Sequence, residues 1–167
     1  MGMIAQQSRN DVINPLDLLE EIVGAYDWTF ERASDDELTV GYPGQWCDYA
    51  LQFTWRDDVS AMNLACALDT RIPAPRQAAI HELLAVVNAK MWVGHFDLAA
   101  ERGLPVFRQA VLLRGPHGAS VEQLEDLVEI AICECERFYP AFQYVAWGGK
   151  TAAEAVEASM IETVGEA

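Results

Sequence analysis

Two runs of alternating apolar and polar residues, joined by a pair of aspartates, constrain this chain more than any other feature. In CDYALQFTWRDDVSAMNLACALD, apolar side chains fall on every second position before the aspartates and again after them. A period of two is typical of a strand with one buried face, and the short turn at Asp57 and Asp58 predicts antiparallel pairing. The sequence therefore predicts an antiparallel sheet, with Cys47 and Cys66 on its apolar side as small hydrophobic residues.

Four further β-prone runs extend this sheet. DWTFERAS and ELTVGYPG are separated by Asp35 and Asp36 and predict a hairpin, which Gly41, Pro43 and Gly44 end. GHFDLAAERGLPVFRQAVLL predicts two more strands that turn at residues 101–103. Turns of this length favour antiparallel neighbours throughout.

Helix start signals mark the other elements. Asn14 precedes Pro15 as an N-cap, and Ser120 with Gln123 and Thr151 with Glu154 have the spacing of capping boxes. Pro140 suits the first turn of a separate short helix. The expected helices cover residues 15–25, 74–91, 120–138, 140–147 and 151–163.

This order of elements predicts an α+β fold, in which helices pack on one face of an antiparallel sheet. At 167 residues the chain fits one domain. We expect a flexible N-terminus at residues 1–13, an α+β domain at residues 14–138, and a C-terminal helical extension at residues 139–163 packed on the same domain.

The excess of acidic over basic residues limits the kinds of molecule that this chain can bind. The net charge is −15, with 26 acidic residues against 11 Lys and Arg, so we expect no nucleic acid partner. The sequence has neither an apolar run of signal-peptide length nor one long enough to cross a bilayer. We therefore expect a cytoplasmic protein with no membrane insertion, whose four cysteines are free thiols.

The stretch ICECERFYPAFQYVAWGGKT contains a cysteine pair and a Gly-Lys-Thr triplet, which are similar to a metal or redox site and to a phosphate-binding loop. On a helical wheel Cys135 joins the apolar stripe, while Cys133 is rotated by about 200° onto an acidic face that disfavours the thiolate. The two thiols cannot share a metal or readily bridge each other. Tyr144 stands where a phosphate-binding loop requires its first glycine, so the Gly-Lys-Thr triplet predicts a junction between helices. We expect no metal and no cofactor.

The histidines leave an alternative open. His95 and Asp97 project from the same face of one expected strand, as an orienting pair would, but no nucleophile elbow or HExxH spacing accompanies them. A solvated strand face explains them as well. A small enzyme or small-ligand-binding protein with a cleft near His95 and Asp97, with Cys47 and Asp48 also near, is the alternative function.

The C-terminal part is unusually aromatic. Its side chains could exceed what the chain's own core covers, and such an apolar surplus indicates a protein-binding or dimer surface. The residues of this candidate surface are Phe138, Tyr139, Phe142, Tyr144 and Trp147.

Several long stretches resemble a known family. WRDDVSAMNLACALDTR, LLAVVNAKMWVGHFDL, GLPVFRQAVLLRG and EQLEDLVEIAICECERFYPAFQYVAWGGKTAAEA are similar to the YbjN domain family, bacterial proteins described as sensory transduction regulators, and in particular to its alphaproteobacterial branch. The resemblance covers about residues 14 to 160. It implies an architecture like that of the small dimeric type III secretion chaperones, which bind extended segments of client proteins.

From these observations we expect no enzymatic activity. The chain is expected to act as a cytoplasmic regulator or chaperone-like adaptor that binds a protein segment, at a sheet edge or in an apolar groove, as a homodimer. Its protein partner is not identified by the sequence.

Overall fold

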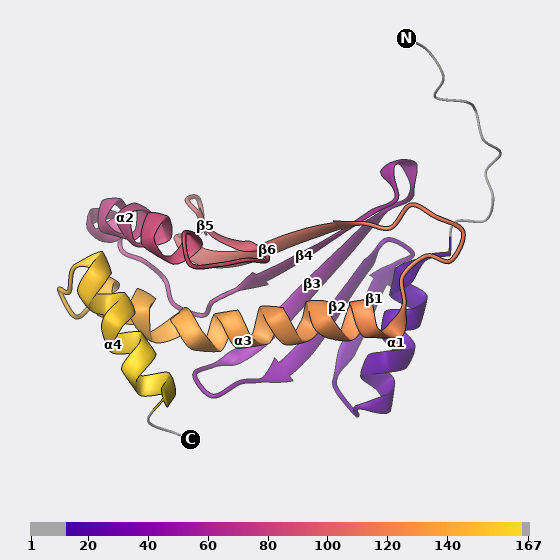
Figure 1. The fold of residues 1–167 in the computed structure, drawn as a ribbon, viewed down its shortest axis with the longest axis horizontal. Helices are drawn as coiled ribbons and strands as arrows, with labels where there is room; N and C mark the ends of the chain where they lie inside the picture. The colour runs from indigo at the N-terminus through magenta and orange to yellow at the C-terminus, as the bar shows by residue number, and fades with distance from the viewer. Residues whose placement is uncertain (1–12, 165–167) are drawn as a thin grey trace, which may run out of the picture.

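A six-stranded antiparallel sheet forms the frame of the chain, as the computed structural model shows for residues 13–164 (Figure 1). Its spatial order is β1-β2-β3-β4-β6-β5. The strands are β1 (Phe30–Ser34), β2 (Glu37–Pro43), β3 (Asp48–Arg56), β4 (Ala61–Ala67), β5 (His95–Ala99) and β6 (Leu104–Leu112). The α+β class and the antiparallel pairing predicted from the alternation are confirmed. Apart from Ile13, the N-terminus expected to be flexible lies outside the described residues.

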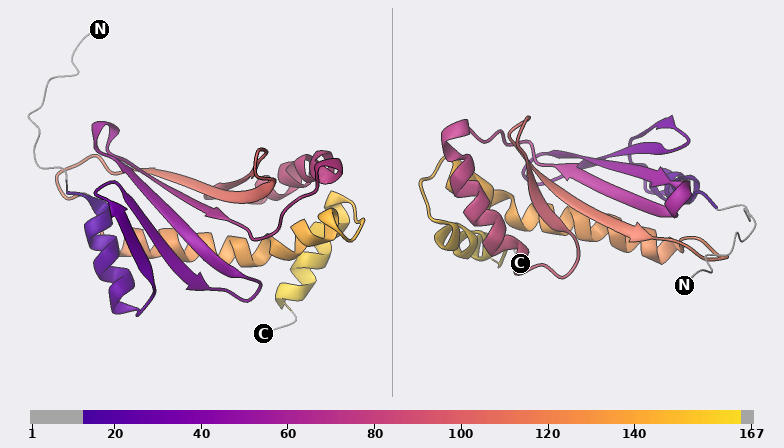
Figure 2. Two further views of the ribbon diagram at one scale, coloured as in Figure 1. Left: turned by 180° about the vertical axis from the view of Figure 1, so that it is seen from behind. Right: turned by 90° about the horizontal axis from the view of Figure 1, so that it is seen from above.

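In the part of the chain that the structure describes, four helices accompany the sheet, with short 3-10 turns at Asp57–Val59 and Ala74–Arg76. The long helix α3 runs along the sheet, with α1 near one end of it and α2 and α4 near the other (Figures 1 and 2). The helices are α1 (Pro15–Ala25), α2 (Gln77–Asn88), α3 (Val121–Ala146) and α4 (Ala152–Val164).

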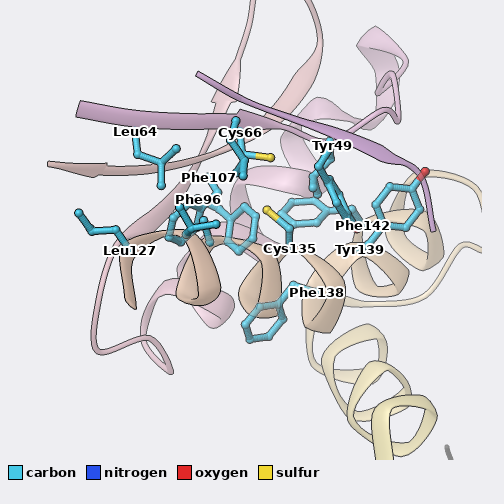
Figure 3. Packing of buried hydrophobic residues seen from close by; sticks show 14 of the residues in the cluster. Tyr49, Leu64, Cys66, Phe96, Phe107, Leu127, Cys135, Phe138, Tyr139 and Phe142 are labelled. Carbon is cyan, nitrogen blue, oxygen red and sulfur yellow. The ribbon is translucent and has the colours of Figure 1, made fainter. Parts of the chain in front are cut away.

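The core lies between the sheet and α3. The alternating side chains of β3 and β4 are buried in register, with Leu51 opposite Cys66 and Phe53 opposite Leu64. Cys66 is fully buried as predicted, and Cys47 is half-buried against the core. Figure 3 shows side chains of β4 and α3 meeting across this layer. Burying one face of the sheet provides the main driving force for folding.

The predicted helix break near Pro140 is wrong, because α3 continues through it from Val121 to Ala146. Proline has no N–H to donate to the carbonyl four residues earlier, here that of Glu136. The indole N–H of Trp46 donates to this carbonyl over 3.1 Å. The hydroxyl of Ser159 on α4 donates to the adjacent carbonyl of Arg137. The Trp46 bond thus supplies the donor that the proline lacks, and the expected extension at residues 139–163 begins inside α3.

The second helix is shorter than the expected 74–91. A 3-10 turn at Ala74–Arg76 precedes it, and α2 ends at Asn88. The Asn88 side chain donates to the carbonyl of Phe96 over 3.0 Å and accepts from the Phe96 N–H over 2.8 Å. One side chain therefore satisfies backbone groups of the edge strand β5, which are otherwise available for pairing with another chain.

The junction between α3 and α4 is a capped turn, as predicted. Thr151 and Glu154 form both hydrogen bonds of a capping box. The last turn of α3 carries no basic residue of its own. The guanidinium of Arg76 instead donates to the carbonyl of Val145, over 3.1 Å from Nε and 2.5 Å from Nη2. A cation at a helix C-terminus is favourable for the helix dipole.

Candidate functional site

An apolar groove of about 390 Å3 opens between α1 and α3 beside β2. We call it the α1–α3 groove. Its lining comes from α1 and the turn after it, from β2, and from the N-terminal half of α3. The lining residues are Ile22, Val23, Tyr26, Trp28, Tyr42, Glu125, Val128, Glu129, Ile132 and Cys133.

The turn after α1 builds one wall of this groove. The N–H of Trp28 donates to the Val23 carbonyl over 3.1 Å, and the N–H of Asp27 donates to the Gly24 carbonyl over 3.2 Å. Asp27 has a φ of 57°, in the left-handed region. This is a Schellman motif, in which the residue after the left-handed position contacts the last turn of the helix. The motif therefore places Trp28 next to Val23 and turns both toward the groove.

Three aromatic rings form a continuous wall. The ring centroids of Tyr26 and Trp28 are 5.5 Å apart, and those of Trp28 and Tyr42 are 5.1 Å apart at an interplanar angle of 72°. Both spacings lie in the range of favourable aromatic pairs. Tyr26 is 56% exposed, so its ring is open to a ligand. The wall therefore combines rigidity with accessible apolar area.

The opposite wall carries negative charge. Glu125 and Glu129 lie one turn apart on α3, and the groove lining contains no Lys, Arg or His. The Tyr26 hydroxyl donates to Glu125 over 3.1 Å, and this bond raises the pKa of Tyr26. Burial raises the pKa of the Cys133 thiol, and the charges of Glu129 and two neighbouring carboxylates raise it further. The groove is thus apolar in its depth and anionic along one side.

The predicted aromatic surface is largely covered by the chain itself. Phe138 and Phe142 are fully buried and pack against Phe96, at ring centroid distances of 6.0 and 5.3 Å. Tyr139 is 8% exposed, and its hydroxyl donates to the Asp69 carbonyl over 3.1 Å. These three residues are core residues of the folded chain, because α3 continues across the sheet beyond Pro140.

The remaining two aromatic residues reach the surface. Tyr144 is half-buried, and its hydroxyl is hydrogen-bonded to Glu162. Trp147 is 64% exposed and lines a second cavity of about 380 Å3, together with residues 71–74, Gln77, Ala100, Glu101 and Gly103. The candidate surface is therefore reduced to Trp147 and part of Tyr144.

The residues of the alternative cleft lie outside the best-formed cavities. His95 and Asp97 are exposed on β5, and neither lines the α1–α3 groove, the cavity at Trp147 or two shallower hollows beside α1 and β1. The Asp97 carboxylate lies 3.4 Å from the Arg108 guanidinium. Cys47 packs against the core while Asp48 is exposed. The structure thus separates Cys47 from the exposed pair instead of joining the residues in one site.

The cysteines lie where the helical wheel places them. Cys135 is buried beside Cys66, with the two sulfur atoms turned toward each other across the core (Figure 3), and Cys133 is exposed on the other side of α3. Within residues 13–164, no three His, Cys, Asp or Glu side chains gather as metal ligands would. None of the helices in this part of the chain has the length and apolarity that crossing a bilayer requires.

Comparison with known proteins identifies the family. The YbjN family profile, described as "Putative bacterial sensory transduction regulator", matches residues 15–144, which is well over half of the chain. The chain belongs to the YbjN family. The match begins with α1 and ends two residues before the end of α3, so it includes every element that lines the groove. No curated protein matches the chain.

A solved YbjN structure has the same fold. The crystal structure of YbjN from E. coli, described there as "a putative transcription regulator", matches with a TM-score of 0.53 at 12% sequence identity. The match covers 88% of this chain and 93% of the E. coli chain. The YbjN architecture is therefore retained at low identity, and the family description is that of a regulator rather than an enzyme.

The sequence predicted an apolar groove as an alternative to a sheet edge, but it did not predict where the groove lies. Its walls come from residues far apart in the chain, such as Tyr26 and Glu125, which are 99 positions apart. A local signal does exist in Tyr26 and Trp28, two large aromatic residues that flank Asp27 at the end of a helix.

Proposed function

We propose that this YbjN-family chain is a non-enzymatic cytoplasmic regulator that binds a segment of another protein in the α1–α3 groove and acts as a homodimer. The observation that carries this proposal is the groove itself, with apolar depth, an aromatic wall and an open mouth. Apolar grooves with a few polar groups are the usual sites for peptide and ligand recognition.

The two edges of the sheet are less suitable than the groove for binding a protein segment. The backbone of β5 is hydrogen-bonded by Asn88, which leaves fewer free groups for an added strand. At the opposite edge, β1 has five residues and an irregular register between Arg32 and Ser34. Short and irregular edges disfavour strand addition. These features support the groove over an edge as the binding surface.

Affinity capture with matched baits tests the proposal. The baits are the full wild-type chain, Cys133→Trp, which fills the groove from an exposed lining position, and Glu82→Trp, which adds the same side chain to α2 at the other end of the molecule. We expect mass spectrometry to find a protein that wild type and Glu82→Trp retain and Cys133→Trp loses. If all three baits retain the same proteins, the groove is not the binding site and the proposal fails.

The homodimer is tested separately. Exposed apolar side chains outside the groove support self-association, in particular Leu112 at 77%, Trp92 at 101% and Trp147 at 64% exposure. Light scattering after size exclusion should give twice the 18.5 kDa mass of one chain at micromolar concentration. A mass of one chain under these conditions would contradict the dimer without affecting the groove.

A further inference from the structure

We infer that the α1–α3 groove selects protein segments that carry a Lys or Arg side chain next to apolar residues. This inference rests on the proposed function and specifies the chemistry of the bound segment. The cation would lie between the aromatic wall and the carboxylates of α3, and the neighbouring apolar side chains would fill the groove.

The first argument is charge complementarity. Glu125 and Glu129 are the charged residues of the lining, and both are acidic. The hydroxyl of Tyr26 and the thiol of Cys133 both have a raised pKa, in part because of these carboxylates. Negative potential therefore acts at both groups. An acidic segment would meet like charge here, whereas a basic segment would be attracted.

The second argument is the position of the aromatic rings. A guanidinium or ammonium group over the face of Trp or Tyr gains a cation–π interaction, which is strongest with Trp. Tyr26 and Trp28 face the same groove as the two carboxylates, so one cation can approach both kinds of group. The methylene stem of Lys or Arg can meanwhile cover apolar surface.

The third argument is that Arg32, a cation on the strand β1 beside α1, has other partners. Arg32 on β1 bonds Asp17 over 3.1 Å and Glu20 over 3.2 Å, and its side chain is 19% exposed. Arg32 does not line the groove. The carboxylates that face the groove are therefore not neutralised by this arginine.

Peptide display tests the inference with a defined probe. A library of short random peptides is selected on the immobilised full chain, and the enriched peptides are measured by fluorescence anisotropy against four variants. Cys133→Trp fills the groove, and Glu125→Gln with Glu129→Gln removes its charge. Glu82→Gln with Glu157→Gln removes the same charge from exposed positions on α2 and α4, outside the groove lining. Trp28→Leu removes the central ring.

We expect enriched peptides to contain Lys or Arg beside apolar residues and to lose binding to Cys133→Trp. Neutralising Glu125 and Glu129 should weaken binding about three- to tenfold, the range expected for exposed charge pairs and cation–π contacts, while the distant pair has little effect. Trp28→Leu should weaken binding by a similar factor. Replacing the peptide's basic residue by methionine should have the same effect as neutralising the carboxylates.

Two other outcomes distinguish this inference from the proposed function. Groove-dependent peptides without a basic residue, or with equal affinity for the neutralised variant, would overturn the charge preference and leave the proposed function standing. Selected peptides that bind Cys133→Trp as well as wild type, or no enrichment at all, would overturn both.

Discussion

At the scale of single residues, Trp46 provides the hydrogen-bond donor that Pro140 cannot provide within α3. The proline removes a backbone donor from the interior of the helix, and the indole N–H of Trp46 replaces it at the Glu136 carbonyl. The ring of Trp46 also stacks on that of Tyr139, with centroids 6.3 Å apart. One surface side chain thus fixes the loop before β3 to the middle of α3.

A double-mutant cycle measures this compensation. Trp46→Phe keeps an aromatic ring but loses the donor, so it should destabilise the chain by about 1 kcal/mol, the usual worth of one hydrogen bond. In a Pro140→Ala background the helix supplies its own donor, and Trp46→Phe should cost less. Urea unfolding followed by circular dichroism gives both values. Equal costs in the two backgrounds would show that the indole bond does not compensate for the proline.

The environment of Cys133 predicts that its thiol is alkylated slowly and that the rate rises at a higher pH than for an ordinary cysteine. Burial and the charges of Glu129, Glu134 and Glu136 raise its pKa above the ordinary 9.0. Only the thiolate reacts, so the rate should still be rising with pH at 9.0. Iodoacetamide labelling read by peptide mass spectrometry gives the profile. Glu129→Gln should lower the midpoint, whereas Glu82→Gln should not, and a profile centred below 9.0 would contradict the assignment.

At the scale of elements, the Schellman motif that ends α1 also shapes the aromatic wall. Asp27 holds the left-handed conformation at a φ of 57° without being glycine. Asp27→Gly should keep or slightly raise stability, whereas Asp27→Val should cost about 1–2 kcal/mol, because a β-branched side chain clashes in that conformation. Thermal unfolding checks the stability. If Asp27→Val leaves the stability unchanged, the left-handed position does not constrain the turn.

The elements that were predicted correctly are those specified by nearby residues. Asn14 caps α1, and Ser120 with Gln123 forms both hydrogen bonds of a capping box, each within a few positions. Pro140 has the same local signature as a helix start. The donor that replaces its missing N–H is Trp46, which lies 90 positions from the Glu136 carbonyl that it bonds. The groove is equally non-local. Periodicity therefore predicts the buried faces, and short motifs predict the helix caps. Contacts between residues far apart in the sequence become visible only in the folded structure.

At the scale of the whole molecule, the acidic net charge limits which partners this chain can bind. The net charge is −15, and four of the arginines that the structure describes pair with acidic side chains. The arginines paired in this way are Arg32, Arg56, Arg108 and Arg137. Binding to the DNA backbone depends on Lys and Arg that are free to displace counterions from phosphates. The E. coli relative is described as a transcription regulator, but at 12% identity that likeness shows the fold alone.

The charge distribution predicts that this chain does not bind DNA directly. Fluorescence anisotropy of a labelled random-sequence duplex, titrated with the full chain at physiological salt, should show no saturable change, while a nonspecific DNA-binding protein provides the positive control. Lowering the salt should not produce binding either, because reduced screening strengthens repulsion between an acidic protein and phosphates. Saturable binding that weakens as salt is added would show a local basic surface that overcomes the net charge. Without it, any effect on transcription is indirect, and we propose the α1–α3 groove as the surface at which a protein partner binds.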